Sequence, residues 1–320
     1  MNQRQLGRTG IAVSEVGYGA WGIGQSMWLG AEDDESVRAL ERAADLGVTL
    51  FDTALAYGDG HSEQLVGALA RERDVVVATK IPPKDMVWPA ADGSDPDDAF
   101  PADYVIESTE QSLRNLGLDT IDVQQFHVWS DDWAGRGSWL EGIEALKSEG
   151  KIRAFGVSIN DHQPSNAIRL IESGAVDTVQ VIYNVFDQSP EDELLAACEQ
   201  HGVGVLARVP FDEGSLTGRI GPDTEFPEGD FRNRYFRDDR KQQVADRVQA
   251  ILDDLAIERD QLPEVALRYI LSHPAVATVI PGMRTVRNVE RNAAVGDGRG
   301  LPADQLAALK QHRWDRNFYR

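Results

Sequence analysis

The feature that most constrains the fold of this chain is a repeat of about 30 residues, in which a short β-branched run is followed by an amphipathic helical pattern. Eight such units in 320 residues fit a closed barrel better than an open sheet. The sequence therefore predicts an α/β fold, the (β/α)₈ TIM barrel. The predicted strands are Glu15–Tyr18, Thr49–Asp52, Val75–Thr79, Thr120–Phe126, Ile152–Ser158, Thr178–Ile182, Val203–Ala207 and Val276–Ile280. The predicted helices are Asp33–Leu46, Ser62–Arg71, Asp103–Leu116, Trp139–Ser148, Gln163–Ser173, Glu191–His201 and Lys241–Leu255.

The connections refine this prediction. Gln5–Val13 reads as an N-terminal β-hairpin around Thr9 and Gly10, placed to cover the barrel floor. Pro82–Pro101 and Pro210–Arg237 are too long to be simple turns, and both follow strands. Since the active site of such a barrel lies at the C-terminal ends of its strands, we expect both loops to border it. No linker divides the chain, so residues 1–320 are expected to form a single domain.

Charge and cysteine content limit the partners and the compartment. The chain has 32 Lys and Arg against 53 Asp and Glu, a net charge of −21, which argues against nucleic acid and anionic membranes as general partners. Its only cysteine is Cys198, so neither an internal disulfide nor a cysteine-based zinc site can form, and no metal site is expected. The N-terminus lacks a signal-peptide pattern, and no apolar run approaches the roughly 20 residues of a membrane span. We expect a cytoplasmic protein.

Four residues that can exchange or stabilise a proton fall at or just after predicted strand ends: Asp52, Tyr57, Lys80 and His127. Taken singly, each could be a salt bridge or a satisfied polar group. Neighbouring strands lie about 4.8 Å apart, however, so their ends can converge on one small volume. The Lys80 ammonium would favour the Tyr57 phenolate, lower its pKa, and be held by Asp52. With His127 bonded to a substrate oxygen, this set suits proton transfer to a carbonyl.

The chain resembles the aldo-keto reductase family along nearly its whole length. The blocks that carry the resemblance are LGRTG (6–10), FDTALAYGDGHSE (51–63), VATK (77–80), QQFH (124–127), GKIRAFGVSIN (150–160) and IPGMRTVRNVERN (280–292). The resemblance implies that Asp52, Tyr57, Lys80 and His127 form the catalytic tetrad, with Tyr57 as the acid in carbonyl reduction. It also implies an NADP(H) cofactor bound on the barrel itself.

The same resemblance implies a set of cofactor contacts. Ser158, Asn160 and Gln180 match residues that hold the nicotinamide carboxamide, and Arg208 stands where relatives stack a Tyr, a role that a guanidinium plane can take. The segment from Pro210 through Gly214, Leu216, Thr217 and Arg219 resembles the loop that covers the diphosphate. The remaining matches, near the adenosine end, are Pro281, Gly282, Arg284, Asn288 and Asn292.

The segment 280–292 is also unusual in its charge. Arg284, Arg287 and Arg291 stand against only Glu290 in an otherwise acidic chain. Cations in the first turns of a helix oppose the helix dipole, and an anion such as the 2′-phosphate of NADP would reconcile the two. The alternative is a solvated helical face.

The substrate is expected to be a small-molecule carbonyl or a sugar. Loop tryptophans suit stacking on a sugar ring, and Asp131 and Asp132 could accept its hydroxyls. The candidates are Trp21, Trp28, Trp88, Trp129 and Trp133. We expect Trp21 and Trp129 to touch substrate because each follows a strand end.

These residues predict an NADP(H)-dependent oxidoreductase that reduces an aldehyde or ketone to an alcohol. An oxidative sugar dehydrogenase would use the same site. Two further classes of protein remain open: a non-catalytic nucleotide-sensing subunit, and a barrel isomerase or hydrolase without nicotinamide.

Overall fold

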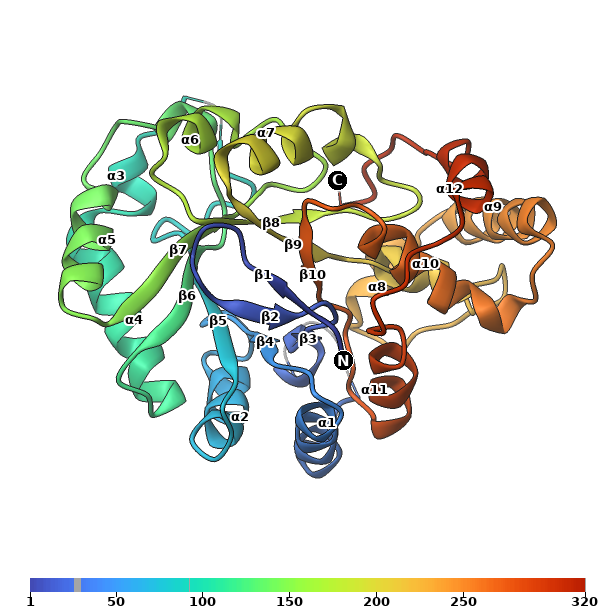
Figure 1. Ribbon diagram of the computed structural model, residues 1–320, viewed down its shortest axis with the longest axis horizontal. Helices are drawn as coiled ribbons and strands as arrows, with labels where there is room; N and C mark the ends of the chain where they lie inside the picture. Colours follow the sequence, from blue (N-terminus) through green and yellow to red (C-terminus); the bar gives the residue numbers. More distant parts are fainter. Residues whose placement is uncertain (26–29, 92, 320) are drawn as a thin grey trace.

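The computed structural model describes residues 1–25, 30–91 and 93–319, and within them eight parallel strands form one curled sheet (Figure 1). The order along the sheet is β10-β9-β8-β7-β6-β5-β4-β3. Parallel bridges between Val16 and Val279 and between Gly19 and Gly282 join the first strand to the last and close the barrel. The predicted (β/α)₈ fold is confirmed. The strands are β3 (Tyr18–Gly19), β4 (Leu50–Asp52), β5 (Val76–Ile81), β6 (Ile121–Phe126), β7 (Ile152–Ser158), β8 (Thr178–Ile182), β9 (Gly204–Arg208) and β10 (Val276–Val279).

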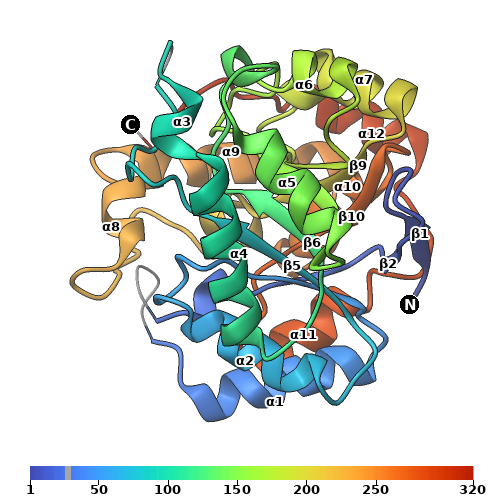
Figure 2. The same ribbon diagram turned by 90° about the vertical axis from the view of Figure 1, so that its left-hand side faces the viewer.

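Helices follow the strands and cover the outside of the barrel (Figures 1 and 2). In the main ones an apolar stripe faces the strands and polar residues face solvent, as in α4, which buries Val105 and Leu116. The longer helices are α1 (Asp33–Asp45), α2 (His61–Ala70), α4 (Ala102–Leu116), α5 (Trp139–Ser148), α7 (Leu194–His201), α9 (Arg240–Leu255), α10 (Leu262–Leu271), α11 (Val286–Ala293) and α12 (Ala303–Lys310). The short ones are α3 (Pro96–Ala99), α6 (Ile168–Ser173), α8 (Phe231–Tyr235) and the 3₁₀ turns η1 (Trp21–Ile23), η2 (Asp131–Trp133), η3 (Ser189–Asp192), η4 (Asp212–Thr217) and η5 (Arg259–Gln261).

Helix α6 is shorter than the sequence predicts, beginning at Ile168 rather than Gln163. Asn166 accounts for part of the difference, because its side chain bonds the backbone of Trp129 and Asp131 and holds the preceding turns. Asp131 in turn accepts the N–H groups of Arg169 and Leu170 in the first turn of the helix. Asp131 therefore caps α6, which differs from its expected role of binding substrate hydroxyls.

The predicted hairpin is present as β1 (Gln3–Gln5) and β2 (Ala12–Ser14), and it covers one end of the barrel (Figure 1). Leu6, Ile11 and Val13 pack in one buried cluster with barrel residues that include Leu50 and Leu206. The approach is so close that a Cβ at position 7, where the structure has Gly7, would lie 2.3 Å from the backbone nitrogen of position 204. Apolar contacts therefore seal this end of the barrel.

The opposite end is built from the long loops (Figure 2). The loop after β5 includes α3, the loop after β9 includes η4 and α8, and the C-terminus lies on the same side of the molecule (Figure 2). Both loops that the sequence singled out therefore lie at the C-terminal ends of the strands. Among the described residues, no helix is both long and apolar enough to cross a membrane.

Candidate active site

The four candidate proton-transfer residues meet at this end of the barrel. Asp52 ends β4, Lys80 lies near the end of β5, and His127 follows β6, while Tyr57 lies in the turn after β4. The Lys80 ammonium donates to Asp52 Oδ2 (2.6 Å) and to the carbonyl of Thr53 (2.8 Å), and it lies 3.4 Å from the Tyr57 hydroxyl. Lys80 has no exposed surface. The fold thus places a buried ammonium directly beside a phenol.

Two glutamines approach the Asp52 oxygen that does not face Lys80. Gln180 Nε2, from β8, donates to Asp52 Oδ1 at 2.7 Å, and Gln125 Nε2, from β6, approaches the same oxygen at 3.3 Å. Both side chains are buried. With one oxygen bonded to Lys80 and the other to glutamine amides, the Asp52 carboxylate is fixed in position. Sequence reasoning missed Gln125, although its position two residues before His127 on an inward-facing strand was the available signal.

His127 forms one wall of the site. Its ring lies 5.6 Å from the Tyr57 ring and 4.5 Å from the Trp88 ring, edge to face in both cases. Trp88 comes from the loop after β5 and is 42% exposed. Phenol, imidazole and indole therefore border the same volume, and Trp88 places an aromatic surface beside the proton-transfer residues.

The environment shifts the pKa values of these groups in different directions. Burial raises the pKa of the Tyr57 phenol, and the opposing charge of Lys80 does not cancel this effect. The expectation of a lowered Tyr57 pKa is therefore wrong for the net shift, although Lys80 acts in the expected direction. Burial alone would lower the Lys80 pKa, but Asp52 and Tyr57 raise it above its ordinary value. Burial, with Lys80 and Arg208 nearby, holds the His127 pKa well below its usual range, so the imidazole is neutral.

Known proteins resemble this chain along most of its length. The model of the Aldo/keto reductase family matches residues 15–313. The chain belongs to the aldo/keto reductase family. Aldo-keto reductase YhdN of Bacillus subtilis is 32% identical over 91% of this chain and 87% of its own length. The NADH-specific methylglyoxal reductase of Escherichia coli is 31% identical, covering 92% of this chain and 93% of its own length. The solved structure of a glycerol dehydrogenase from Gluconobacter oxydans is 28% identical, with a TM-score of 0.77, and covers 97% of this chain and 94% of that one.

The residues expected to hold a nicotinamide ring cluster beside the tetrad of this aldo/keto reductase. Ser158 ends β7, and Asn160 follows it; both are buried, as is Gln180. Arg208 ends β9, and its Nη2 donates to the carbonyl of Ile159 (2.9 Å) and to Asp161 Oδ1 (2.8 Å). The side-chain atoms Asn160 Oδ1 and Arg208 Nε are buried without a hydrogen-bond partner within the described part of the chain. One unsatisfied acceptor and one unsatisfied donor complement the N–H and C=O groups of a carboxamide, so these two side chains suit the nicotinamide expected here.

The loop after β9 holds the residues expected at the diphosphate. Pro210 and Leu216 are buried, Gly214 and Thr217 are half-buried, and Arg219 is exposed. The Thr217 hydroxyl donates to the carbonyl of Gly214 at 2.6 Å and tightens the loop. Gly214 has φ of 107°, a conformation that glycine adopts readily. The structure brings these residues together in one loop, with η4 at its centre.

The residues expected at the adenosine end lie just before α11 and along it. The carbonyl of Pro281 accepts from Gly19, and Gly282 is exposed just before the helix. Arg284 and Asn288 are half-buried, and Asn292 is buried. The Arg284 side chain packs over Gly22, where a Cβ would lie 2.7 Å from Arg284 Cδ.

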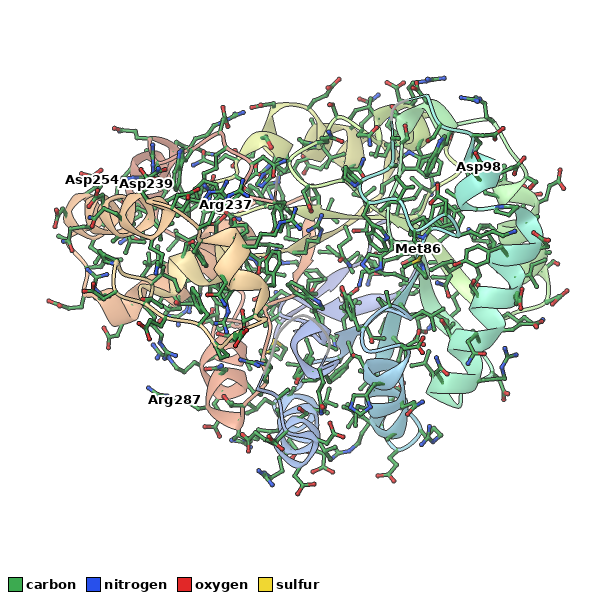
Figure 3. All side chains as sticks on the ribbon, turned by 180° about the vertical axis from the view of Figure 1, so that it is seen from behind. Met86, Asp98, Arg237, Asp239, Asp254 and Arg287 are labelled. Carbon is green, nitrogen blue, oxygen red and sulfur yellow. The ribbon has the colours of Figure 1, made fainter. Side chains whose placement is uncertain are left out.

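The two other arginines of this segment differ from Arg284 in exposure. Arg287 is exposed and extends away from α11 (Figure 3). Arg291 is also exposed and donates to the carbonyl of Asp260. Arg284 is therefore the member of the cluster that the fold holds in place at the start of the helix.

The loop tryptophans separate into two groups. Trp129 has no exposed surface and packs edge to face against Trp133 and Trp139, so the expectation that it touches substrate does not fit its position. Trp133 is also buried. Trp21 is half-buried against Phe231 of α8, and Trp88 is exposed beside His127. Trp28 lies outside the described residues.

Proposed function

We propose that this aldo/keto reductase reduces an aldehyde or ketone to the alcohol, using NADP(H) and a proton from Tyr57. The observation that carries the proposal is the buried Lys80 ammonium, held by Asp52 and placed 3.4 Å from the Tyr57 hydroxyl. An ion pair that only stabilised the fold would not need a phenol beside its ammonium group. An ammonium beside a phenol stabilises the phenolate that remains after the proton has left.

Each residue has a separate part in the reaction. A bound reduced nicotinamide supplies a hydride to the carbonyl carbon. Tyr57 is protonated at neutral pH, since even an unshifted phenol has a pKa near 10 and burial raises the pKa of Tyr57, and it donates its proton to the carbonyl oxygen. Lys80 stabilises the resulting phenolate, and Asp52 keeps Lys80 charged. Neutral His127 donates a hydrogen bond that orients the substrate oxygen.

The residues present also suit the cofactor. Ser158, Asn160 and Gln180 would hold the carboxamide, with Arg208 against the ring. The loop from Pro210 to Arg219 would cover the diphosphate. Arg284, with Asn288 and Asn292, would hold the adenosine and its 2′-phosphate, which is the reason for preferring NADP(H) over NAD(H).

The substrate proposed is a small polar carbonyl or a sugar. Trp88, and Trp21 on the side of α8, offer aromatic surface at the mouth of the site, and indole packs on the C–H face of polyhydroxylated compounds. The relatives named for methylglyoxal reduction and glycerol dehydrogenation act on small oxygenated compounds, which supports this class. Oxidation of an alcohol would use the same residues with Tyr57 as the base.

A carbonyl panel tests the proposal. Purified protein is mixed with NADPH or NADH and with methylglyoxal, glyceraldehyde, aldoses and aromatic aldehydes, and the absorbance of the reduced cofactor is followed. Loss of absorbance that depends on the carbonyl is expected. Binding of the dinucleotide without turnover of any carbonyl, or of any polyol in the reverse direction, would favour a nucleotide-sensing protein instead.

A further inference from the structure

The loop after β9 contains an acidic pair, Asp212 and Glu213, and both residues are buried. They lie between Pro210 and Gly214, inside the segment proposed to receive a diphosphate. A free carboxylate beside a diphosphate is unfavourable, because like charges at close range repel strongly where water is excluded. The chain must therefore neutralise this pair or turn it away for the loop to bind a dinucleotide.

The C-terminal tail, residues 312–319, supplies partners for both carboxylates. Arg316 Nη2 pairs with Asp212 Oδ2 at 2.5 Å, and the two side chains are 7% and 1% exposed. The second oxygen of Asp212 accepts from the Tyr235 hydroxyl at 3.2 Å. The Tyr319 hydroxyl donates to Glu213 Oε1 at 2.5 Å. Both bonds from the tail connect residues more than 100 positions apart in the sequence.

Aromatic packing fixes the tail in this position. The Arg316 guanidinium lies 4.1 Å from the ring centre of Trp314 and 4.8 Å from that of Phe318. Tyr235 of α8 packs edge to face on both Phe318 and Tyr319. The C-terminus and the α8 segment lie on the same side of the barrel in Figure 2. Arg316 is thus a buried cation whose only charged partner in the described ion pairs is Asp212.

The loop backbone needs such support. Val209, Asp212 and Glu213 have φ of 53°, 49° and 54°, in the left-handed region that side chains other than glycine disfavour. Such conformations persist where surrounding contacts hold them. Two of these three residues, Asp212 and Glu213, accept hydrogen bonds from the tail.

We propose that Arg316 and Tyr319 are positioning residues of the cofactor site: they pair with Asp212 and Glu213, draw the two carboxylates toward the tail and leave the loop free to receive the dinucleotide's diphosphate. The inference rests on the proposed function, since it requires a dinucleotide at this loop. It assigns to the C-terminal tail a share in cofactor affinity. Because NADP⁺ and NAD⁺ have the same diphosphate, the tail acts equally on both.

Binding measurements test this role without relying on turnover. The dissociation constants of NADP⁺ and NAD⁺ are measured by calorimetry for the wild type and Arg316→Met. We expect both constants to rise about tenfold or more, because Asp212 loses its counter-charge. Adding Asp212→Asn to Arg316→Met should restore most of the affinity. Such a rescue in folded proteins would assign the loss of affinity to the unpaired Asp212 charge rather than to the lost packing of the Arg316 side chain.

The controls use the same tail. Arg313→Met removes the surface ion pair with Asp192 and should leave both constants within about twofold. Tyr319→Phe removes only the hydroxyl that reaches Glu213, so it keeps the test available if Arg316→Met does not fold; both constants should rise about threefold at pH 8.

The outcomes separate this inference from the proposed function. Failure of the wild type to bind either dinucleotide would remove the proposed function itself. If Arg316→Met folds and binds both dinucleotides with the wild-type dissociation constants, the role of the tail is overturned and the proposed function stands. If Arg316→Met does not fold, wild-type constants for Tyr319→Phe have the same meaning. A folded double variant that regains no affinity would also overturn the role of the tail.

Discussion

At the scale of single residues, the buried pair of Lys80 and Asp52 links stability to function. The two side chains are 0% and 4% exposed, so neither charge is solvated by water. Asp52→Asn leaves the ammonium unpaired and should lower the free energy of unfolding by about 3 kcal/mol, because an isolated buried charge is costly. Denaturant titration measures this change. Asp45→Asn breaks the exposed pair with Arg73 and should cost less than about 1 kcal/mol; equal losses would contradict the account.

Glu213 makes a residue-scale prediction about pH. Burial raises its pKa from 4.5 to about 7, with Asp212 and Asp161 adding to the rise and Tyr319 and Arg208 opposing it. The unfolded chain therefore releases this proton at lower pH than the folded chain does. Protonated Glu213 makes the folded protein more stable than ionised Glu213 does. This extra stability is fully present below pH 4.5 and is lost as the pH rises through about 7.

This loss can be measured against a variant that does not titrate. Between pH 4.5 and 8 the wild type should lose about 3 kcal/mol of stability relative to Glu213→Gln, by the linkage of pKa and folding. Urea titrations at several pH values give the difference. Glu228→Gln, at an exposed position of the same loop, should show the same dependence of stability on pH as the wild type. If the stability of Glu213→Gln also follows the wild type at every pH, the raised pKa of Glu213 is refuted.

At the scale of elements, the loop after β5 brings substrate-facing surface to the strand ends. Trp88→Ala should raise KM for the carbonyl about tenfold, because the loss of about 1.4 kcal/mol of binding free energy corresponds to a factor of ten. The dissociation constant of the cofactor should not change. Steady-state kinetics and calorimetry check the two quantities. Val87→Ala, an equally exposed neighbour, is the control, and a KM for Trp88→Ala no higher than that of this control would place Trp88 outside the substrate site.

The start of α11 is the element expected to choose between cofactors. Arg284→Ala should reduce kcat/KM for NADPH about thirtyfold and that for NADH less than about threefold, because only NADPH has a 2′-phosphate for the guanidinium to bind. Measuring both cofactors with one carbonyl gives an internal control. An equal reduction for both would show that Arg284 does not recognise the phosphate.

At the scale of the whole molecule, the sequence predicted the barrel well, because the repeated period and the strand-end residues are local patterns. Asp52, Lys80 and His127 could be grouped from strand order alone, since parallel strands end at one face. Contacts between distant segments left no such pattern. The pairing of Asp212 with Arg316, the contact of Trp88 with His127 and the burial of Trp129 depend on how loops fold over the barrel, and hydrophobic periodicity does not encode that.

The net charge of −21 also acquires a structural context at this scale. A dinucleotide is a polyanion, so an acidic protein must provide local positive charge or neutralise its own carboxylates. The described site neutralises its carboxylates: Lys80 pairs with Asp52, Arg208 with Asp161 and Arg316 with Asp212. The acidity of the remaining surface does not conflict with the proposed cofactor.

The proposed reduction depends most directly on the proton that Tyr57 donates. Tyr57→Phe removes the hydroxyl beside Lys80 and keeps the ring against His127, so kcat for carbonyl reduction with NADPH is the most direct measurement. We expect kcat to fall about 10³-fold while the dissociation constant of NADP⁺ stays within about twofold, because only the general acid is lost. A Tyr57→Phe protein that binds NADP⁺ normally and reduces the carbonyl at the wild-type rate would contradict this role of Tyr57.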